Sequence, residues 1–304
     1  MLLQELEKKG LIHPPKWLAS NCQYLCIMGS VAYGVSSDTS DYDVYGWAIP
    51  PKIMTFPHLA GDILGFGKQK KRFEQYQEHH IMDESALGGK GREYDFNIYN
   101  IVKYFNLCMD GNPNMVDSLF VPQTCILHTT NIANIVRDNR KLFLSKVMWH
   151  RFKGYSYSQL HKASGKSPEK GSKRYELREK YGMDTKYLYH LVRLLSEVEQ
   201  ILVEGDLDLQ EKGRREHMKA IRRGEVSLDD IRKWASDKEK SLENLYHSST
   251  LQYSPDETKI RQLLLNCLEE HYGSLDKCIV QPDESLTTLK EVQEVLDRHS
   301  NLLK

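Results

Sequence analysis

Two carboxylates near the start of the chain, Asp41 and Asp43, have the type and spacing that most directly indicate chemistry. They alternate within a run that ends at Ala48. Successive side chains of a strand point to opposite faces, so we expect both carboxylates on one face, separated by Tyr42. Two negative charges this close repel each other, and a divalent cation relieves the repulsion. Mg²⁺ is usually held by one or two carboxylates together with substrate phosphates, so the pattern predicts a site for Mg²⁺ or Mn²⁺.

The residues before this pair predict an anion-binding turn. An apolar run over 24–28 predicts a strand, and Gly29 and Ser30 follow it directly. We expect a short helix over 31–34, whose free N–H groups and the Ser30 hydroxyl face an anion. The turn would hold phosphates while the carboxylates hold the metal.

The order of these residues resembles a known signature. Gly29-Ser30, ten intervening residues and then Asp-Tyr-Asp are similar to the signature of the DNA polymerase beta superfamily of nucleotidyltransferases. The longer strings GSVAYG and SDYDVYGW resemble its RNA-repair-pathway branch. The resemblance implies an α+β fold with a mixed sheet and helices, and two Mg²⁺ or Mn²⁺ ions shared by Asp41 and Asp43. It also implies that Gly29, Ser30 and Tyr33 belong to a nucleotide site.

A third carboxylate is expected on a further strand. The segment 92–100 alternates and is rich in aromatic and β-branched residues, which predicts a strand. In the resembled superfamily a neighbouring strand contributes one acid, for which Asp95 is the candidate and Glu93, on the same face, is the competitor. We favour Asp95, because the next segment resembles the family's helix, Gly-Asn-Pro turn and second helix. Asp95 would complete the second metal site and accept the proton of an attacking hydroxyl.

The rest of the chain suggests two domains. Glycines interrupt residues 57–91, which predicts a flexible loop near the mouth of the active site, with a basic group at 68–72. The alternative is a loop that is only solvated. After Pro122 the pattern is helical, and nothing strand-like of comparable length follows except 278–280. We therefore expect a nucleotidyltransferase catalytic domain over 1–130 and a mostly helical nucleotide- or substrate-binding domain over 131–304.

The second domain contains a basic cluster. From Lys162 to Lys180 there are seven basic residues, among them Lys173 and Arg174, against three acids. This surplus indicates binding of a polyphosphate or an RNA end. The alternative is a solvated linker and helix face.

A helix is predicted over 185–204, with Asp184 as its N-cap. Its apolar residues cluster on one side, and the other side presents Lys186, His190, Arg193 and Glu197, a row that suits contacts to the phosphates of a nucleotide. The alternative, which periodicity alone favours, is an exposed charged helix face. The string from Tyr181 to Lys186, followed by His190 and Arg193-Leu194-Leu195, resembles a second signature of the same branch. The resemblance implies that Asp184, Lys186, His190 and Arg193 bind nucleotide. Met183 replaces an aromatic residue that the family often has there.

Composition limits the remaining choices. The chain has 304 residues, of which 40% are apolar, and 42 basic residues balance 42 acidic ones. A neutral total argues against a protein that coats nucleic acid non-specifically. None of the six cysteines forms a Cys-x-x-Cys pair. With no signal peptide and no long apolar run, we expect a cytoplasmic protein without a membrane partner.

The expected function is therefore a metal-dependent transfer of a nucleoside monophosphate from an NTP to an acceptor hydroxyl. The resemblance implies an RNA acceptor, such as the 3′ end of a tRNA or of a damaged RNA. Two alternatives stay open. One is nucleotidylylation of a protein hydroxyl by the same site, and the other is a catalytically idle nucleotide-binding or antitoxin-like partner.

Overall fold

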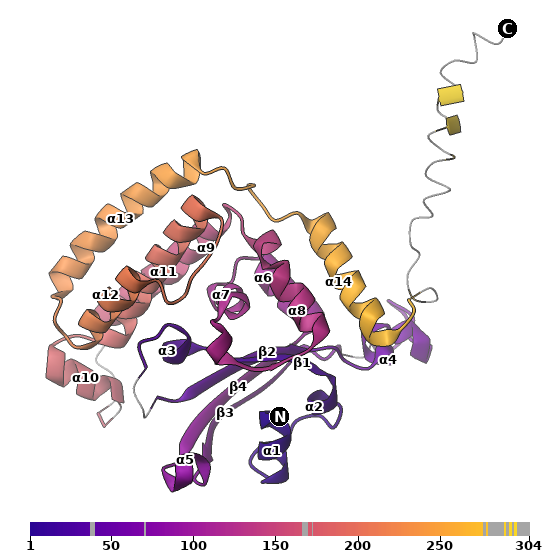
Figure 1. Cartoon of the computed structure of the whole chain (residues 1–304), viewed down its shortest axis with the longest axis horizontal. Coiled ribbons are helices and arrows are strands. Elements are labelled where there is room, and N and C mark those ends of the chain that lie inside the picture. Colours follow the sequence, from indigo (N-terminus) through magenta and orange to yellow (C-terminus); the bar gives the residue numbers. More distant parts are fainter. Residues whose placement is uncertain are drawn as a thin grey trace.

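A mixed five-stranded sheet lies at the centre of the protein (Figure 1). The computed structural model describes residues 1–36, 40–69, 71–165, 170–171, 173–275, 278, 289, 292–293 and 295–296. The strands are β1 (Cys22–Ile27), β2 (Tyr42–Ala48), β3 (Gln75–Asp83), β4 (Arg92–Asn100) and β5 (Ile126–Thr129). Their order is β3-β4-β2-β1-β5, with β2 parallel to β4 and the other neighbours antiparallel.

α-Helices supply most of the remaining regular structure. They are α1 (Leu2–Lys8), α2 (Leu18–Asn21), α3 (Gly29–Ala32), α4 (Lys52–Thr55), α5 (Ala86–Gly89), α6 (Ile101–Met109), α7 (Pro113–Phe120), α8 (Asn131–Asp138), α9 (Met148–Ser164), α10 (Lys173–Tyr181), α11 (Thr185–Glu204), α12 (Lys212–Arg222), α13 (Leu228–Ser248) and α14 (Glu257–Tyr272). Side chains that accept hydrogen bonds from the first-turn N–H groups explain where several helices begin. These caps are Asn100, Asn112, Thr130, Asp184, Ser227 and Asp256. The predicted α+β class is confirmed.

Two apolar clusters cover the two faces of the sheet, because alternate strand residues point to opposite sides. On one face, Leu25 and Val44 pack with Leu3 and Leu6 of α1. On the other face, buried residues of β1 and β2 join the helices α6, α7, α8, α9 and α11. Figure 1 shows α1 and α2 on one side of the sheet and these larger helices on the other.

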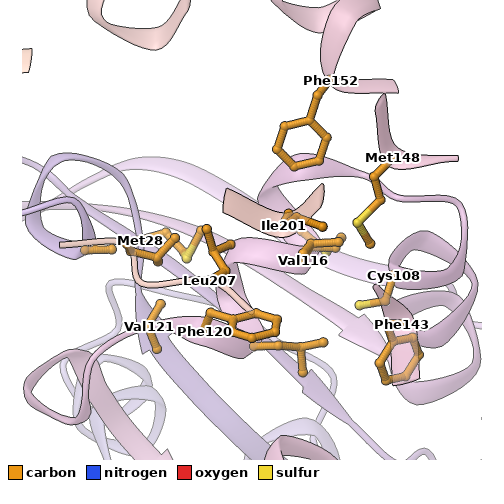
Figure 2. Packing of buried hydrophobic residues seen from close by; sticks show 14 of the residues in the cluster. Met28, Cys108, Val116, Phe120, Val121, Phe143, Met148, Phe152, Ile201 and Leu207 are labelled. Atoms are coloured by element: carbon orange, nitrogen blue, oxygen red, sulfur yellow. The ribbon is translucent and has the colours of Figure 1, made fainter. Parts of the chain in front are cut away.

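The larger cluster joins the sheet to the helices of the second half of the chain. Figure 2 shows Met28 next to β1, Cys108 of α6, Val116 of α7 and Ile201 of α11 in the same apolar region. Helix α11 also packs against α9, α12 and α13. The division of the chain at residue 130 stays a prediction. No helix in the described ranges is long and apolar enough to span a bilayer.

Several predicted elements agree with the structure, and two strands were not predicted. The strand over 92–100 and the helix over 185–204 have the bounds of β4 and α11. The prediction of a flexible loop over 57–91 is wrong for β3, which pairs with β4 along most of its length. The four-residue strand β5, which pairs with β1, was not predicted either. The predicted strand over 278–280 lies largely outside the described residues.

Candidate active site

Helix α3 and strand β2 meet at the carboxylate of Asp43. Gly29 has a φ of +64°, in the left-handed region that glycine adopts without steric cost. A Cβ at Gly29 would lie 2.1 Å from Asp43 Oδ2, so only glycine leaves room for this carboxylate. The Met28 N–H also donates to the backbone carbonyl of Asp43 at 2.7 Å. The Gly-Ser turn and the Asp-Tyr-Asp strand are thus in contact.

Asp43 and Asp95 lie side by side on neighbouring strands, as Cα partners in the parallel pair β2–β4. Burial raises the pKa of Asp43 above its usual range; Lys186 of α11 opposes this shift, whereas Asp95 and Asp41 add to it. Asp41 and Asp95 therefore both lie within electrostatic reach of Asp43. Their excess negative charge, and the preference of Mg²⁺ for carboxylate oxygens, make this donor set fit a divalent cation.

Strand β3 bulges opposite Asp95, where His79 and His80 together face this one residue of β4. Such a bulge bends the strand and redirects its side chains. His80 has a φ of 57°, and its N–H donates to Asp95 Oδ1 at 2.7 Å. The His80 Nδ1 lies 2.7 Å from Glu93 Oε1, and the His79 Nδ1 lies 3.5 Å from Asp95 Oδ1. The bulge thus brings two imidazoles to the acids of β4.

A second possible set of metal ligands follows from this bulge. Within the described ranges, His80, Glu93 and Asp95 are the three residues whose ligand atoms all lie within 4.8 Å of one another. Both acids considered for the third ligand belong to this set. Asp95 is the one paired with Asp43, so the structure gives a reason to keep it as the preferred ligand.

Cations from α10, α11 and α12 lie beyond the carboxylates. His190 of α11 is half-buried, and its pKa lies well below the usual range. Burial is the main cause, and the charges of Arg193, Lys186, Arg174 and Arg222 further disfavour its protonation. The exposed Lys186 also acts on Asp43, where it opposes the rise in pKa that burial causes. Lys186 is therefore within electrostatic reach of both the acidic and the basic groups. A polyphosphate and its metal ions would find charges of the required sign on both sides.

Arg193 has a different position from the one its helix pattern predicts. Its side chain is buried, and its Nη1 donates to Asp117 Oδ2 of α7 at 2.6 Å and to the hydroxyl of Tyr33. The Tyr33 hydroxyl in turn donates to Asp117 Oδ2 at 2.9 Å. Glu197, also buried, lies 3.8 Å from Arg193 Nε. The exposed charged face that periodicity favours is therefore wrong for Arg193 and Glu197, because Arg193 pairs with Asp117 inside the protein and Glu197 is buried beside it.

Asp184 caps α11, as predicted, by accepting from the N–H groups of Lys186 at 3.0 Å and Tyr187 at 3.3 Å. Arg174 lies 3.7 Å from Asp184 Oδ2, and its guanidinium lies 4.0 Å from the centre of the Tyr187 ring. These groups border a cavity of about 290 Å³ lined by His161, Lys162, Gly165, Arg174, Arg178, Asp184 and Tyr187. The side chain of Lys173 lies outside what the structure describes.

A larger cavity, of about 440 Å³, lies between α11, α12 and α13. None of the candidate residues lines it. We therefore place the site at the carboxylates of β2 and β4.

Several residues at or beside the site were not predicted. Arg222 lies near His190, and its Nη1 donates to the Val35 carbonyl at 2.6 Å. For Asp117 a usable sign was present in the sequence, because a single acid inside the apolar string MVDSLF needs a buried partner. His79 and His80 had no such sign, since only the bulge directs them to Asp95.

Comparison with known proteins identifies the class. A sequence model of the RlaP family, the RNA repair pathway DNA polymerase beta family, matches residues 3–264. No curated protein matches the chain. The crystal structure of a nucleotidyltransferase-like protein from Exiguobacterium sibiricum is similar at 10% identity, covering 81% of this chain and 73% of that one, with a TM-score of 0.27. A likeness at that score carries no argument.

A mixed sheet with a Gly-Ser turn against paired carboxylates, in a chain matched over this length, defines a nucleotidyltransferase of the DNA polymerase beta type. More particularly, the chain belongs to the RNA repair pathway DNA polymerase beta family. The family predicted from the two signatures is confirmed.

Proposed function

We propose that this protein transfers a nucleoside monophosphate from an NTP to a hydroxyl at the 3′ end of an RNA. The observation that carries the proposal is the in-register pair Asp43 and Asp95, which lies within reach of Lys186 on α11. Residues 1–130 supply the carboxylates and residues 131–304 supply the cations, which supports the proposed division of labour between the two parts.

The metal site would consist of Asp41, Asp43 and Asp95. Two Mg²⁺ or Mn²⁺ ions, when bound, would lower the pKa of the acceptor hydroxyl and neutralise phosphate charge. Asp95 accepts the hydroxyl proton, directly or through a water molecule. The acceptor oxygen bonds to the α-phosphorus, and the bond from that phosphorus to the pyrophosphate oxygen breaks.

Cationic side chains would bind the phosphates. Lys186 and Arg222 stabilise the charge of the departing pyrophosphate, and the neutral His190 donates or accepts a hydrogen bond. Arg174 extends this basic surface, Lys173 would add a further phosphate contact, and Asp184 orients the start of α11 by capping it. Gly29 and Ser30 approach the triphosphate through the turn.

Arg193 contributes indirectly in this proposal. Its guanidinium lies 4.4 Å from the centre of the Tyr33 ring and holds the Tyr33 hydroxyl. Tyr33 follows α3 directly, so the buried ion pair fixes the position of the turn against β2.

The experiment is a transfer assay with each of four NTPs labelled at the α-phosphate, with Mg²⁺ or Mn²⁺. A cell lysate is divided into an RNA fraction and a protein fraction, and the variant Asp43→Asn is the blank. Label in RNA that depends on Asp43 is the expected result. Label only in protein would replace the proposal with protein nucleotidylylation, and label in neither fraction would favour an idle nucleotide-binding protein.

A further inference from the structure

Three polar side chains form a row along strand β3. Gln75, Gln77 and His79 alternate in sequence, so they point to one face, and all three are exposed. Gln75 Nε2 donates to Gln77 Oε1 at 3.0 Å, and Gln77 Nε2 lies 2.6 Å from His79 Nε2. The row ends at the active site, because His79 Nδ1 lies 3.5 Å from Asp95 Oδ1.

The β3 row lies on the same face of the sheet as the candidate carboxylates. Gln77 pairs with Asn97 and Gln75 pairs with Tyr99, and residues directly opposite each other share a face. Asn97 and Tyr99 alternate with Asp95 on β4. Amide and aromatic groups therefore continue from Asp95 along both strands.

Aromatic and basic groups lie at the far end of the β3 row. Tyr155 of α9 is 44% exposed, and it is close enough to Tyr99 to raise the pKa of that phenol, although burial is the larger cause. Lys68, Lys71 and Arg72 lie in the segment just before β3, and all three are exposed. From Gln75 to His79 the strand rises about 13 Å, at about 3.3 Å per residue.

This composition fits a single nucleic acid strand. Side-chain amides both donate to and accept from base edges, tyrosine rings stack on bases, and lysine and arginine meet phosphates. In an RNA duplex the Watson–Crick edges are paired and the major groove is too narrow for side chains, so a duplex offers these amides fewer contacts than a single strand. A peptide would more naturally pair with the free backbone edge of β3, which is the outer strand of the sheet.

Resting on the proposed function, we infer that the β3 row binds the last nucleotides of a single-stranded RNA acceptor and leads its 3′-hydroxyl to Asp95. The Gln75 and Gln77 amides contact bases or ribose hydroxyls, and the basic segment before β3 contacts phosphates further along the strand. Recognition by amides and stacking tolerates many sequences, so the acceptor is selected for being single-stranded at its end.

The test measures RNA binding apart from catalysis. Fluorescence anisotropy of a labelled 12-nucleotide RNA, without NTP, is recorded for the unaltered protein and for the double variant Gln75→Ala/Gln77→Ala. Gln262→Ala is the matched control, because Gln262 is an exposed glutamine on α14, outside the site. The same RNA annealed to its complement serves as the duplex probe. Melting temperatures confirm that each variant is folded.

We expect the double variant to bind the single strand about tenfold more weakly, which corresponds to about 1.4 kcal/mol. Gln75→Glu/Gln77→Glu should weaken binding further, because it places negative charge against the RNA. Gln262→Ala should bind like the unaltered protein, and the duplex should bind least. Equal binding by the double variant, preference for the duplex, or no binding of the single strand would each overturn the inference. Label transfer to RNA by a double variant with unchanged binding would leave the proposed function standing without the β3 row.

Discussion

Arg193 of α11 donates to Asp117 of α7 across 2.6 Å in the interior of the protein, with both side chains buried. This ion pair connects a helix of the second half of the chain to the part that carries the carboxylates. Removing one partner leaves the other charge buried without compensation. We expect Arg193→Met to lower the free energy of unfolding by about 3–5 kcal/mol.

A matched double variant separates the charge from the packing. Replacing a whole buried pair by apolar residues is often neutral, so Arg193→Met/Asp117→Leu should recover most of the lost stability. Urea denaturation of the two single variants and the double variant measures this. A double variant as unstable as Arg193→Met would show that the pair does not act as a unit.

The stability of the protein should fall as the pH rises through the neutral range. Burial, and then the nearby Asp117, raise the pKa of Glu197 to about 8, although Arg193 and Arg214 oppose the shift. An unfolded glutamate titrates at about 4.3. Between these values the folded protein holds a proton that the unfolded chain releases, so the free energy of unfolding decreases with increasing pH.

The measurement is the urea midpoint at pH 5.5 and pH 8.5. The unaltered protein should be less stable at pH 8.5, and Glu197→Gln should reduce the difference. Glu84→Gln, at an exposed position, should keep the original difference. An equal pH effect in Glu197→Gln would assign the titration to another group.

The sequence predicted the centre of the sheet better than its edges. Strand β4 alternates polar and apolar residues from Glu93 to Ile98, and the pattern over 92–100 therefore located it correctly. Strand β3 carries polar residues on its exposed face, and its bulge at His79 and His80 breaks the two-residue period. An edge strand with a bulge resembles a loop in sequence, because half of its pairing partners and its regular alternation are missing.

Contacts between residues far apart in the sequence explain what was missed at the site. Gly29, Asp41 and Asp43 lie within one short stretch, so the sequence indicated them together as one candidate site. The burial of Arg193 depends on Asp117, which lies 76 positions away, and helical periodicity assigns a charged residue to solvent unless its partner is known. Contacts of this kind follow from tertiary packing and not from local pattern.

Gly29→Ala tests the contact between the turn and the carboxylate. The added Cβ would lie 2.1 Å from Asp43 Oδ2, and φ at this position is +64°. The backbone cost is about 1–2 kcal/mol, which a folded protein of this size tolerates. We expect the variant to remain folded with transfer reduced more than tenfold, because Asp43 must move.

Gly61→Ala is the control, since Gly61 has a similar φ of +80° and open space around it. Full activity in Gly29→Ala would show that Asp43 has no fixed position.

Lys186→Ala tests the cationic side of the site. Lys186 is exposed, so its loss should change the melting temperature little. It lowers the pKa of Asp43 and lies near His190, which places it where a phosphate would bind. We expect the KM for NTP to rise about tenfold at low salt and by less at high salt, where screening already weakens the interaction.

The control is Lys240→Ala. Lys240 is an exposed lysine on α13, so this change should leave the KM unchanged. A KM that does not respond to Lys186→Ala would remove this residue from the nucleotide site.

Asp43→Asn should separate the stability of the site from its activity. Burial raises the pKa of Asp43, so its charged form is unfavourable in the absence of a cation, and the neutral amide should keep or raise the melting temperature. The same change should lower transfer by at least about 100-fold, the scale of losing one group that stabilises developing charge.

Melting curves with and without 10 mM Mg²⁺ test whether Asp43 holds the ion. Mg²⁺ should raise the melting temperature of the unaltered protein and of Asp237→Asn, an exposed acid on α13, but not that of Asp43→Asn. If Mg²⁺ stabilised Asp43→Asn as strongly as the unaltered protein, the ion would bind elsewhere, and the His80, Glu93 and Asp95 set would become the next site to test.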